Sequence, residues 1–420
     1  MPALQPVRGT TDQLGDSRAR HNHVVTTAQQ IALRYGYEDM ATPIFEFTEV
    51  FSKPLGASSD VVTKETYSFE DRGGSSLTLR PEGTAGCMRA VISNGLTQSL
   101  PLRWFYHGPM FRYERPQKGR MRQFHQIGAE LIGVAGASAD AEIIGLGAQI
   151  LDGLGVLEDT SLHLNSLGDS QSRAQYKSAL MAYLADYEDQ LSDDSKRRLT
   201  TNPLRILDSK DATDRQIVAD APSLSDALTD EAKRHFEQVT DLLDRAGIAW
   251  QFDPLLVRGL DYYAHTAFEF ITDKLGAQGT VLGGGRYDGL SEMLGGPALP
   301  AVGFAAGIER LALLASPPPD MPADKIAIFA ADAEAAAGCF AIAHELRGAG
   351  LPVVMMHSGN MKKNMKSADR LKCRFSIIAG SDELVRNQVA VRNMADSTQR
   401  DIDCDQLIAY LRAELGLPAS

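Results

Sequence analysis

The stretch GPMFRYERPQKGRMRQFHQ occupies residues 108–126 and organises the rest of the chain. Its pattern predicts a strand that ends in Arg112-x-Glu114, a polar loop with proline and glycine, and a return strand after Arg122. An arginine fixed on a strand and a second arginine in a loop can hold phosphate oxygens through forked, charge-assisted hydrogen bonds. Glu114 could accept a hydrogen bond from the exocyclic amine of a base. A surface hairpin with solvated charges is the alternative, and it would leave Arg-x-Glu without a role.

The sequence around this hairpin predicts an antiparallel sheet. Strand-like runs interrupted by glycine and proline continue from Tyr37–Phe47 through 76–80 and 102–106 to Gly133. An amphipathic helix is expected upstream at 17–36, with apolar residues at helical spacing, and another at 138–154.

Three changes of pattern divide the chain. Long helical patterns with little glycine replace the strands between 166 and 248, strand-like sequence resumes at 252, and the proline-rich segment 316–322 is typical of a stiff linker. Beyond it, short strands alternate with helices, which favours an α/β domain with a mostly parallel sheet. We therefore expect a first domain in two parts, 1–165 and 249–316, with a helical insertion at 166–248 between them. A linker at 317–324 then leads to a terminal α/β domain at 325–420.

Composition indicates a soluble, cytoplasmic protein without a membrane span. Hydrophobic residues make up 44% and charged residues 23% of the 420 residues, and no run of about 18 apolar residues occurs. The four cysteines lie far apart and pair with no histidine at metal-ligand spacing, so no metal site is expected. The net charge of −12 does not exclude nucleic acid, because phosphates respond to local charge. Between 362 and 374 basic residues recur against the single acid Asp369, although a solvated helix face would show the same composition.

Familiar nucleotide-binding motifs do not fit. The chain has no GxxxxGK[ST] loop, and Gly283-Gly284-Gly285 precedes no crossover helix of a βαβ unit. An NAD-type oxidoreductase is therefore a poor reading of the glycine-rich segments.

The complete set of motifs resembles the histidyl-tRNA synthetase family of class II aminoacyl-tRNA synthetases. Residues 108–126 resemble motif 2, residues 303–311 (GFAAGIERL) resemble motif 3, and Tyr37 to Phe45 is similar to the dimer-forming motif 1. Two further peptides, 256–263 (LVRGLDYY) and 284–290 (GGRYDGL), look like those peculiar to the histidine enzymes. The resemblance covers essentially the whole chain. It implies an α+β catalytic domain with an antiparallel sheet, a helical insertion and a C-terminal α/β anticodon-binding domain.

The resemblance also implies roles in ATP-dependent activation of histidine. Arg112 would hold the α-phosphate of ATP and the carboxylate of histidine, and Arg258 would lie on the other side of that phosphate. Arg120 and Arg310 would clamp the β- and γ-phosphates with Mg²⁺, and Glu114 would orient the adenine. Such an arrangement spreads positive charge over a transition state formed by two anions. Ordinary ion pairs of these arginines are the structural alternative.

Histidine recognition requires acceptors for the ammonium group and partners for both ring nitrogens. In the family, the histidine-binding set includes Arg112, which would also bind the histidine carboxylate, and Arg258. Glu130 and Tyr263 would bind the ring, whereas Tyr262 fits a pocket wall or a core position equally well. The remaining histidine-binding residues would be Glu82, Gly83, Thr84 and Gln126. A site that hydrogen-bonds both nitrogens rejects other side chains without a separate editing domain.

The implied activity is that of a histidine–tRNA ligase acting on ATP, L-histidine and tRNA(His). The insertion would clamp tRNA, the segment 362–374 would contribute to the anticodon-binding surface, and the chain would form a homodimer. A non-catalytic paralogue that regulates histidine biosynthesis is the alternative. Such paralogues lack the terminal domain and parts of the ATP and histidine motifs.

Overall fold

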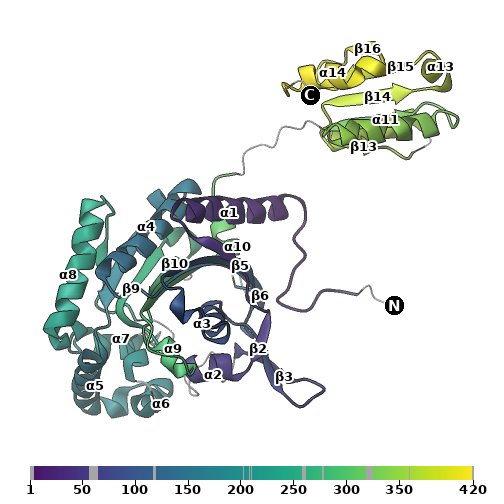
Figure 1. The fold of residues 1–420 in the computed structure, drawn as a ribbon. Coiled ribbons are helices and arrows are strands. Elements are labelled where there is room, and N and C mark those ends of the chain that lie inside the picture. Colours follow the sequence, from purple (N-terminus) through teal and green to yellow (C-terminus); the bar gives the residue numbers. More distant parts are fainter. Residues whose placement is uncertain are drawn as a thin grey trace. The chain divides into compact units, whose positions relative to one another are not determined.

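Contacts divide the computed structural model into two compact units, Met1–Ser316 and Pro317–Ser420 (Figure 1). Among the described residues, no helix combines the length and the apolarity that crossing a membrane would require. The residues that the structure describes are 4–55, 65–116, 120–201, 203–207, 209, 211–257, 262–276, 279–317, 325–358 and 360–418.

A sheet of eight strands forms the centre of the first unit. Its six inner strands pair antiparallel, and a parallel strand is added at each edge. The predicted antiparallel sheet is therefore confirmed. In spatial order the strands are β1 (Glu38–Met40), β5 (Leu102–Phe111), β6 (Gln123–Ile132), β11 (Ala301–Gly307), β10 (Thr280–Arg286), β9 (Ala264–Ile271), β7 (Ser161–Ser166) and β8 (Gln251–Phe252).

Helices cover both faces of this sheet, so its central strands are buried on both sides. Figure 1 shows one group of helices outside the curve of the sheet and a second group inside it. The outer group contributes to one apolar core and the inner group to another. The outer helices are α1 (Gly15–Arg34), α4 (Ala137–Gly153), α8 (Asp230–Arg245) and α10 (Ile308–Leu314), and the inner ones are α2 (Glu49–Leu55), α3 (Thr84–Ser93) and α9 (Leu290–Met293).

Helix α1 shows why the sequence pattern identified these elements. Val24, Ala28 and Ile31 recur at helical spacing and are buried against the sheet. The helix stops before Gly36, whose φ of 78° is left-handed and suits a residue without Cβ.

The predicted helical insertion follows β7. Its helices start at side-chain caps, such as Asp169, whose Oδ1 accepts from the N–H of Ser172 at 2.7 Å. The short helix α7 (Ala212–Ala219) was not predicted, because its apolar residues span only two turns. The other insertion helices are α5 (Ser170–Ala185) and α6 (Asp193–Thr201), and α8 returns the chain to the large sheet. A separate small sheet pairs β2 (Phe45–Phe47), β4 (Ser76–Leu79) and β3 (Tyr67–Glu70).

The second unit is the expected α/β domain, but its sheet is mixed. Three strands run parallel, in the order β13 (Val353–Met355), β12 (Ile326–Ala330) and β14 (Phe375–Ala379). The expectation of a mostly parallel sheet is wrong for the other half, where β15 (Gln388–Asn393) and β16 (Gln399–Asp403) form an antiparallel hairpin. Residues 380–387 between β14 and β15 are too few for the crossover that a parallel pair needs, and β16 was not predicted because it is polar and exposed. The helices are α11 (Ala336–Gly348), α12 (Met361–Arg370), α13 (Ser381–Val385) and α14 (Cys404–Glu414).

Candidate active site

The predicted hairpin is formed by β5 and β6, and its loop presents Arg112 to a cavity. The N–H of Arg112 donates to the carbonyl of Arg122 at 2.9 Å, which closes the base of the loop. The Arg112 side chain is also held: Nε donates to the Pro81 carbonyl at 2.9 Å, and the guanidinium lies 5.2 Å from the centre of the Phe124 ring. Arg112 is thus oriented before any ligand binds, with donors left over.

One cavity brings most of the predicted site residues together. It lies at the hairpin and extends over β10, β11 and the start of α10. The predicted residues that border it are Glu82, Thr84, Arg112, Glu114, Arg120, Gln126, Tyr262, Tyr263 and Arg310. Residues that border it without having been predicted are Met121, Phe124, Thr280, Val281, Leu282, Gly283, Ala305, Gly307 and Glu309. A second, open cavity shares Arg112, Arg120 and Arg310 and continues to Arg215 and Val218 on α7.

Three arginines gather at one end of the cavity. Arg120 Nε lies 2.6 Å from a Glu114 carboxylate oxygen, and Arg310 Nη1 donates to the Thr280 carbonyl at 2.7 Å. Burial, followed by the charge of Arg120, lowers the pKa of Arg310. Positive charges brought together with incomplete solvation favour an anionic ligand, so this end suits phosphate groups.

Glu82 and Gly83 form the start of helix α3. The Glu82 carboxylate accepts from the N–H of Thr84 at 2.5 Å and from that of Ala85 at 3.1 Å. Burial raises the pKa of Glu82, while the backbone donors oppose that shift. Gly83 does not border the cavity, but a Cβ there would collide with the Tyr106 ring, so glycine permits the packing of Tyr106.

The other end of the cavity rests on a fully buried carboxyl group. Glu130 receives hydrogen bonds from Thr84 Oγ1 at 2.7 Å, from the Tyr106 hydroxyl at 3.2 Å and from the Tyr287 hydroxyl. Burial outweighs these donors and raises the pKa of Glu130 to about 8. A Cβ on Gly303, its neighbour on β11, would meet this carboxyl group. Glu130 therefore lies directly behind the cavity wall at Thr84, without bordering the cavity itself.

Buried polar atoms without a protein partner face the same region. Gln126 Oε1 and the Tyr262 hydroxyl find no hydrogen-bond partner among the described residues. Both side chains border the cavity, as does Tyr263, whose ring centre lies 4.9 Å from that of Tyr262. Because unpaired buried polar atoms are costly, they indicate where a polar ligand would bind.

Two tyrosines of the Glu130 network were missed from the sequence. Tyr106 lies on the predicted strand 102–106, and Tyr287 lies in the peptide 284–290. Both segments were recognised in the sequence, but neither tyrosine was assigned a role. In that peptide, buried Arg286 holds the carboxylate of Asp140 at the start of α4 and donates to the Val134 carbonyl at 3.0 Å. Its role is to join β10 to α4. Arg258, the other residue predicted as catalytic, lies outside the described residues.

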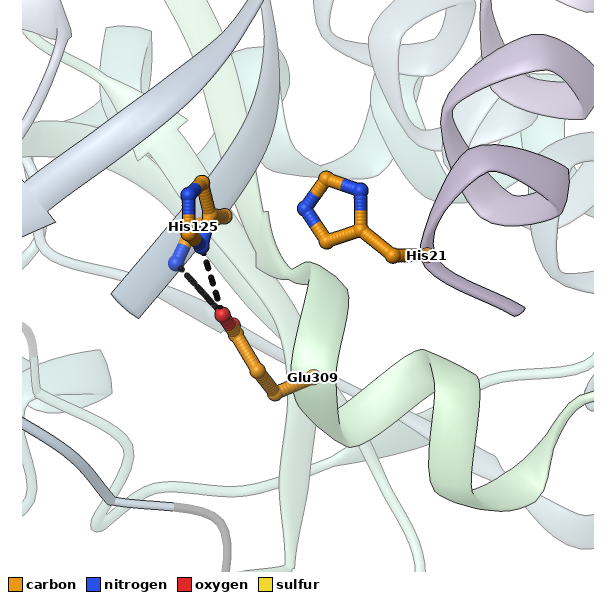
Figure 2. Close-up of side chains that lie close together, drawn as sticks. All are labelled: His21, His125 and Glu309. Atoms are coloured by element: carbon orange, nitrogen blue, oxygen red, sulfur yellow. Dashed lines mark hydrogen bonds and ion pairs between the residues drawn. The ribbon is translucent and has the colours of Figure 1, made fainter. Parts of the chain in front are cut away.

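A group of potential metal ligands joins α1, β6 and α10 beside the cavity: His21, His125 and Glu309 (Figure 2). Their ligand atoms lie within 4.8 Å of one another. Burial, followed by the charge of His125, lowers the pKa of His21 to about 4, so its ring is neutral.

The hydrogen bonds in this group do not suit a cation. Arg18 Nη1 lies 3.4 Å from His21 Nδ1, and a guanidinium only donates, which leaves the ring proton on Nε2. For Nε2 to bind a metal, the ring proton would have to move to Nδ1, where it would face the Arg18 guanidinium. Both oxygens of Glu309 already accept from the backbone N–H of His125. His125 and Glu309 thus form a hydrogen-bonded pair, whereas His21 Nε2 has no hydrogen-bond partner among the described residues.

Comparisons with known proteins identify the family of the chain. Residues 9–311 match the family model for histidyl-tRNA synthetase, and residues 325–414 match the model for the anticodon binding domain. A histidine–tRNA ligase from Gluconacetobacter diazotrophicus is 52% identical over 416 residues, covering 99% of this chain and all of that protein. One from Rhodospirillum rubrum is 53% identical over 417 residues, covering 98% and 99%. The crystal structure of apo histidyl-tRNA synthetase from S. aureus matches with a TM-score of 0.82 at 34% identity, covering 98% of this chain and 100% of that one.

The antiparallel sheet, with arginines supplied by a strand hairpin and by a strand–helix junction, defines a class II aminoacyl-tRNA synthetase catalytic domain. Within that class, the chain belongs to the histidyl-tRNA synthetase family.

Proposed function

We propose that the chain is a histidine–tRNA ligase, which forms histidyl-adenylate from L-histidine and ATP and then transfers histidine to tRNA(His). The single observation that carries the proposal is that one cavity is bordered by Arg112, Arg120 and Arg310 and also by Thr84, which is hydrogen-bonded to buried Glu130; we interpret these as two ends of one site. A carboxylate, a triphosphate and an imidazole are the chemical groups that these two ends can bind.

At the arginine end, the proposed reaction is attack of the histidine carboxylate on the α-phosphorus of ATP. Arg112 is assigned to the α-phosphate and the attacking carboxylate, and Arg120 and Arg310 to the departing pyrophosphate. Fixed donors stabilise charge that develops in the transition state without reorganising. The hydrogen bond from Arg112 to the Pro81 carbonyl supports this assignment, because it directs the guanidinium in advance.

Glu114 and Arg258 complete this end of the proposed site. Glu114 is assigned to the adenine, and its pairing with Arg120 would then be exchanged or shared when ATP binds. Mg²⁺ enters as the MgATP substrate, since its oxygen ligands would come chiefly from phosphates. Arg258 is assigned to the α-phosphate from the family resemblance alone.

At the other end, the proposed ligand is the histidine side chain and its ammonium group. Glu82, Thr84 and Gln126 supply acceptors for the ammonium, and Gly83, assigned with them, leaves room for the Tyr106 ring. Tyr263 is assigned to a ring nitrogen and Tyr262 to the wall, and Glu130, behind the wall at Thr84, is assigned to the ring nitrogens through the hydroxyl groups bound to it. A carboxyl group with a pKa near 8 is mostly neutral at physiological pH, so it can act as donor or acceptor without a buried charge.

We further propose that tRNA spans the two units. The cavity that continues from the arginines to Arg215 on α7 is open, which suits the 3′ end of tRNA beneath the helical insertion. Basic residues on and after α12, opposed by Asp369, suit phosphates near the anticodon. In this proposal the catalytic parts are 1–165 and 249–316, the insertion is 166–248, and 317–324 links them to 325–420.

The chain is also proposed to act as a cytoplasmic homodimer. Residues near the motif 1 resemblance leave large apolar side chains exposed, and such clusters commonly mark subunit interfaces. They are Leu33, Ile44, Phe45 and Phe47.

The test is ATP–pyrophosphate exchange by the purified protein, followed by charging of a tRNA(His) transcript. Exchange should depend on histidine, and charging should reach a substantial fraction of the added tRNA. Exchange without charging would contradict the second step. The absence of both would favour the regulatory paralogue. The retained arginines and the terminal domain argue against that paralogue.

A further inference from the structure

The structure assigns a positioning role to His125. We infer that His125 fixes the Glu309 carboxylate, and with it the first turn of α10, so that Arg310 meets the phosphates of ATP. The inference rests on the proposed function, because binding of ATP by Arg310 is its readout.

The pairing of β11 with β6 ends two residues before Glu309. Strand β11 pairs with β6 as far as Gly307 opposite Gln126, and the chain then turns into α10. The next residue of β6, His125, has lost its neighbour on that side. The Glu309 carboxylate replaces the missing strand: its two oxygens lie 3.1 and 3.0 Å from the His125 backbone nitrogen.

The His125 ring adds a further bond to the same carboxylate. His125 Nδ1 lies 2.7 Å from Glu309 Oε1, so the proton on this nitrogen is donated to the carboxylate. Figure 2 shows both contacts converging on one carboxylate group. Backbone and side chain of one residue thereby hold Glu309 in a single orientation, and hydrogen bonds to a charged acceptor are the stronger kind.

Helix α1 supports the ring from the other side. The centres of the His21 and His125 rings lie 4.8 Å apart at an angle of 89°. The ring edge of His21 that carries Nε2 is turned toward His125 (Figure 2). Arg18 holds the opposite nitrogen at 3.4 Å. The His125 ring is therefore fixed on the face that does not contact Glu309.

Glu309 in turn positions its neighbour in the chain. Arg310 is the next residue of a helix only seven residues long, and both residues border the cavity. Arg310 Nη1 is anchored by the Thr280 carbonyl of β10 at 2.7 Å. Forked recognition of phosphate tolerates displacements of only about 0.5 Å. Without the ring bond the Glu309 carboxylate would be held by the backbone N–H alone, and a shift of the first turn of α10 could then exceed that tolerance while the fold stays intact.

The experiment compares His125→Leu with His125→Asn in the full-length chain. Leucine removes the ring donor, whereas the asparagine amide places an N–H close to the position of Nδ1. We expect His125→Leu to raise the KM for ATP in the exchange reaction by about 10–100-fold, the worth of one hydrogen bond to a charged group. The KM for histidine should change less than about twofold, and His125→Asn should restore most of the loss. His107→Leu, an exposed histidine on adjacent β5, is the matched control and should behave as the unaltered chain.

A double-variant cycle separates this inference from the proposed function. Arg310→Ala should itself raise the KM for ATP, and His125→Leu added to it should cause no further loss, because both act through one group. If Arg310→Ala binds ATP normally, the proposed role of Arg310 is wrong and the inference falls with it. If Arg310→Ala is impaired but His125→Leu is normal, or if the two effects multiply, only the positioning role is overturned. A fall in kcat that merely follows the folded fraction in a thermal melt would also overturn it.

Discussion

The two ends of the cavity differ in how their polar groups are held. At the arginine end, the Arg120 side chain is 39% exposed, and Arg112 and Arg310 each have a backbone carbonyl as anchor. At the other end, Glu130 is wholly inaccessible and three hydroxyl groups bind its two oxygens. The arginine end is thus partly open to solvent, whereas the other end is buried: the hydrogen bonds of Glu130 are filled there, and Gln126 Oε1 and the Tyr262 hydroxyl lack a partner among the described residues.

This difference matches what each end has to bind. Phosphates carry several charges and arrive hydrated, so partly solvated arginines can exchange water for ligand at little cost. An imidazole differs from other side chains only in shape and in two nitrogens, so its recognition requires groups that cannot rearrange. A rigid, satisfied network excludes wrong ligands because any mismatch leaves a buried group unpaired.

Removing Arg112 should cause the largest loss. Arg112→Ala is expected to lower kcat for exchange by about 10²–10³-fold, the usual effect of one preorganised donor to a transition state. Arg112→Lys should recover little, because an ammonium cannot reproduce the fork. Arg115→Ala, an exposed arginine of the same loop, serves as the control in exchange assays without tRNA. Near-normal exchange by Arg112→Ala would remove this residue from the catalytic assignment.

Changing the buried carboxyl group of Glu130 should raise the KM for histidine and leave the KM for ATP unchanged. Glu130→Gln keeps the shape but replaces one oxygen, which can accept a hydrogen bond, by an amide nitrogen that only donates, so the KM for histidine should rise by about 10–100-fold. Glu142→Gln, on α4 and paired with Arg103 at 3.0 Å, is the matched control. An equal rise in the KM for ATP would mean that the two ends are not separate.

The same variant should flatten the pH dependence of stability. The folded chain keeps the Glu130 proton up to a pH of about 8, because its pKa is raised to that value, whereas the unfolded chain releases it near 4.5. Rising pH therefore favours unfolding between about 4.5 and 8, and glutamine removes that effect. Between pH 4.5 and pH 8 the difference between the two melting temperatures should shift on the order of several degrees in favour of Glu130→Gln. A constant difference across this range would show that Glu130 is not protonated in the fold.

The smallest effect is expected at Tyr262. Its buried hydroxyl has no partner among the described residues, so Tyr262→Phe should leave the melting temperature unchanged or slightly raised. If histidine supplies the missing partner, the KM for histidine rises a few-fold, on the order of one neutral hydrogen bond. A lower melting temperature with an unchanged KM would place Tyr262 in the core alone.

Much of this architecture could be predicted from the sequence. The hairpin at 108–126 and the apolar spacing of α1 depend on residues that are close together in the chain, so they can be recognised without the tertiary structure. The site residues came from short motifs, and most of them border one cavity. The motifs could not show how deeply each side chain is buried. Glu130 and Thr84 were both predicted to bind histidine, yet only Thr84 borders the cavity, since burial of Glu130 depends on the neighbouring strand at Gly303.

The missed features share a physical cause. Tyr106, Tyr287 and Glu309 act through partners more than twenty residues away, which no window of sequence contains. Strand β16 was missed because edge strands need no apolar residues, and their register comes from the preceding hairpin.

The most direct test of the two-ended cavity is exchange kinetics with ATP and histidine each varied, for Arg310→Ala and Glu130→Gln side by side. Two opposite patterns are expected: Arg310→Ala should raise the KM for ATP alone, and Glu130→Gln the KM for histidine alone. If both variants raise both constants by similar factors, the cavity is one undivided site, and its division into a phosphate end and an imidazole end is wrong.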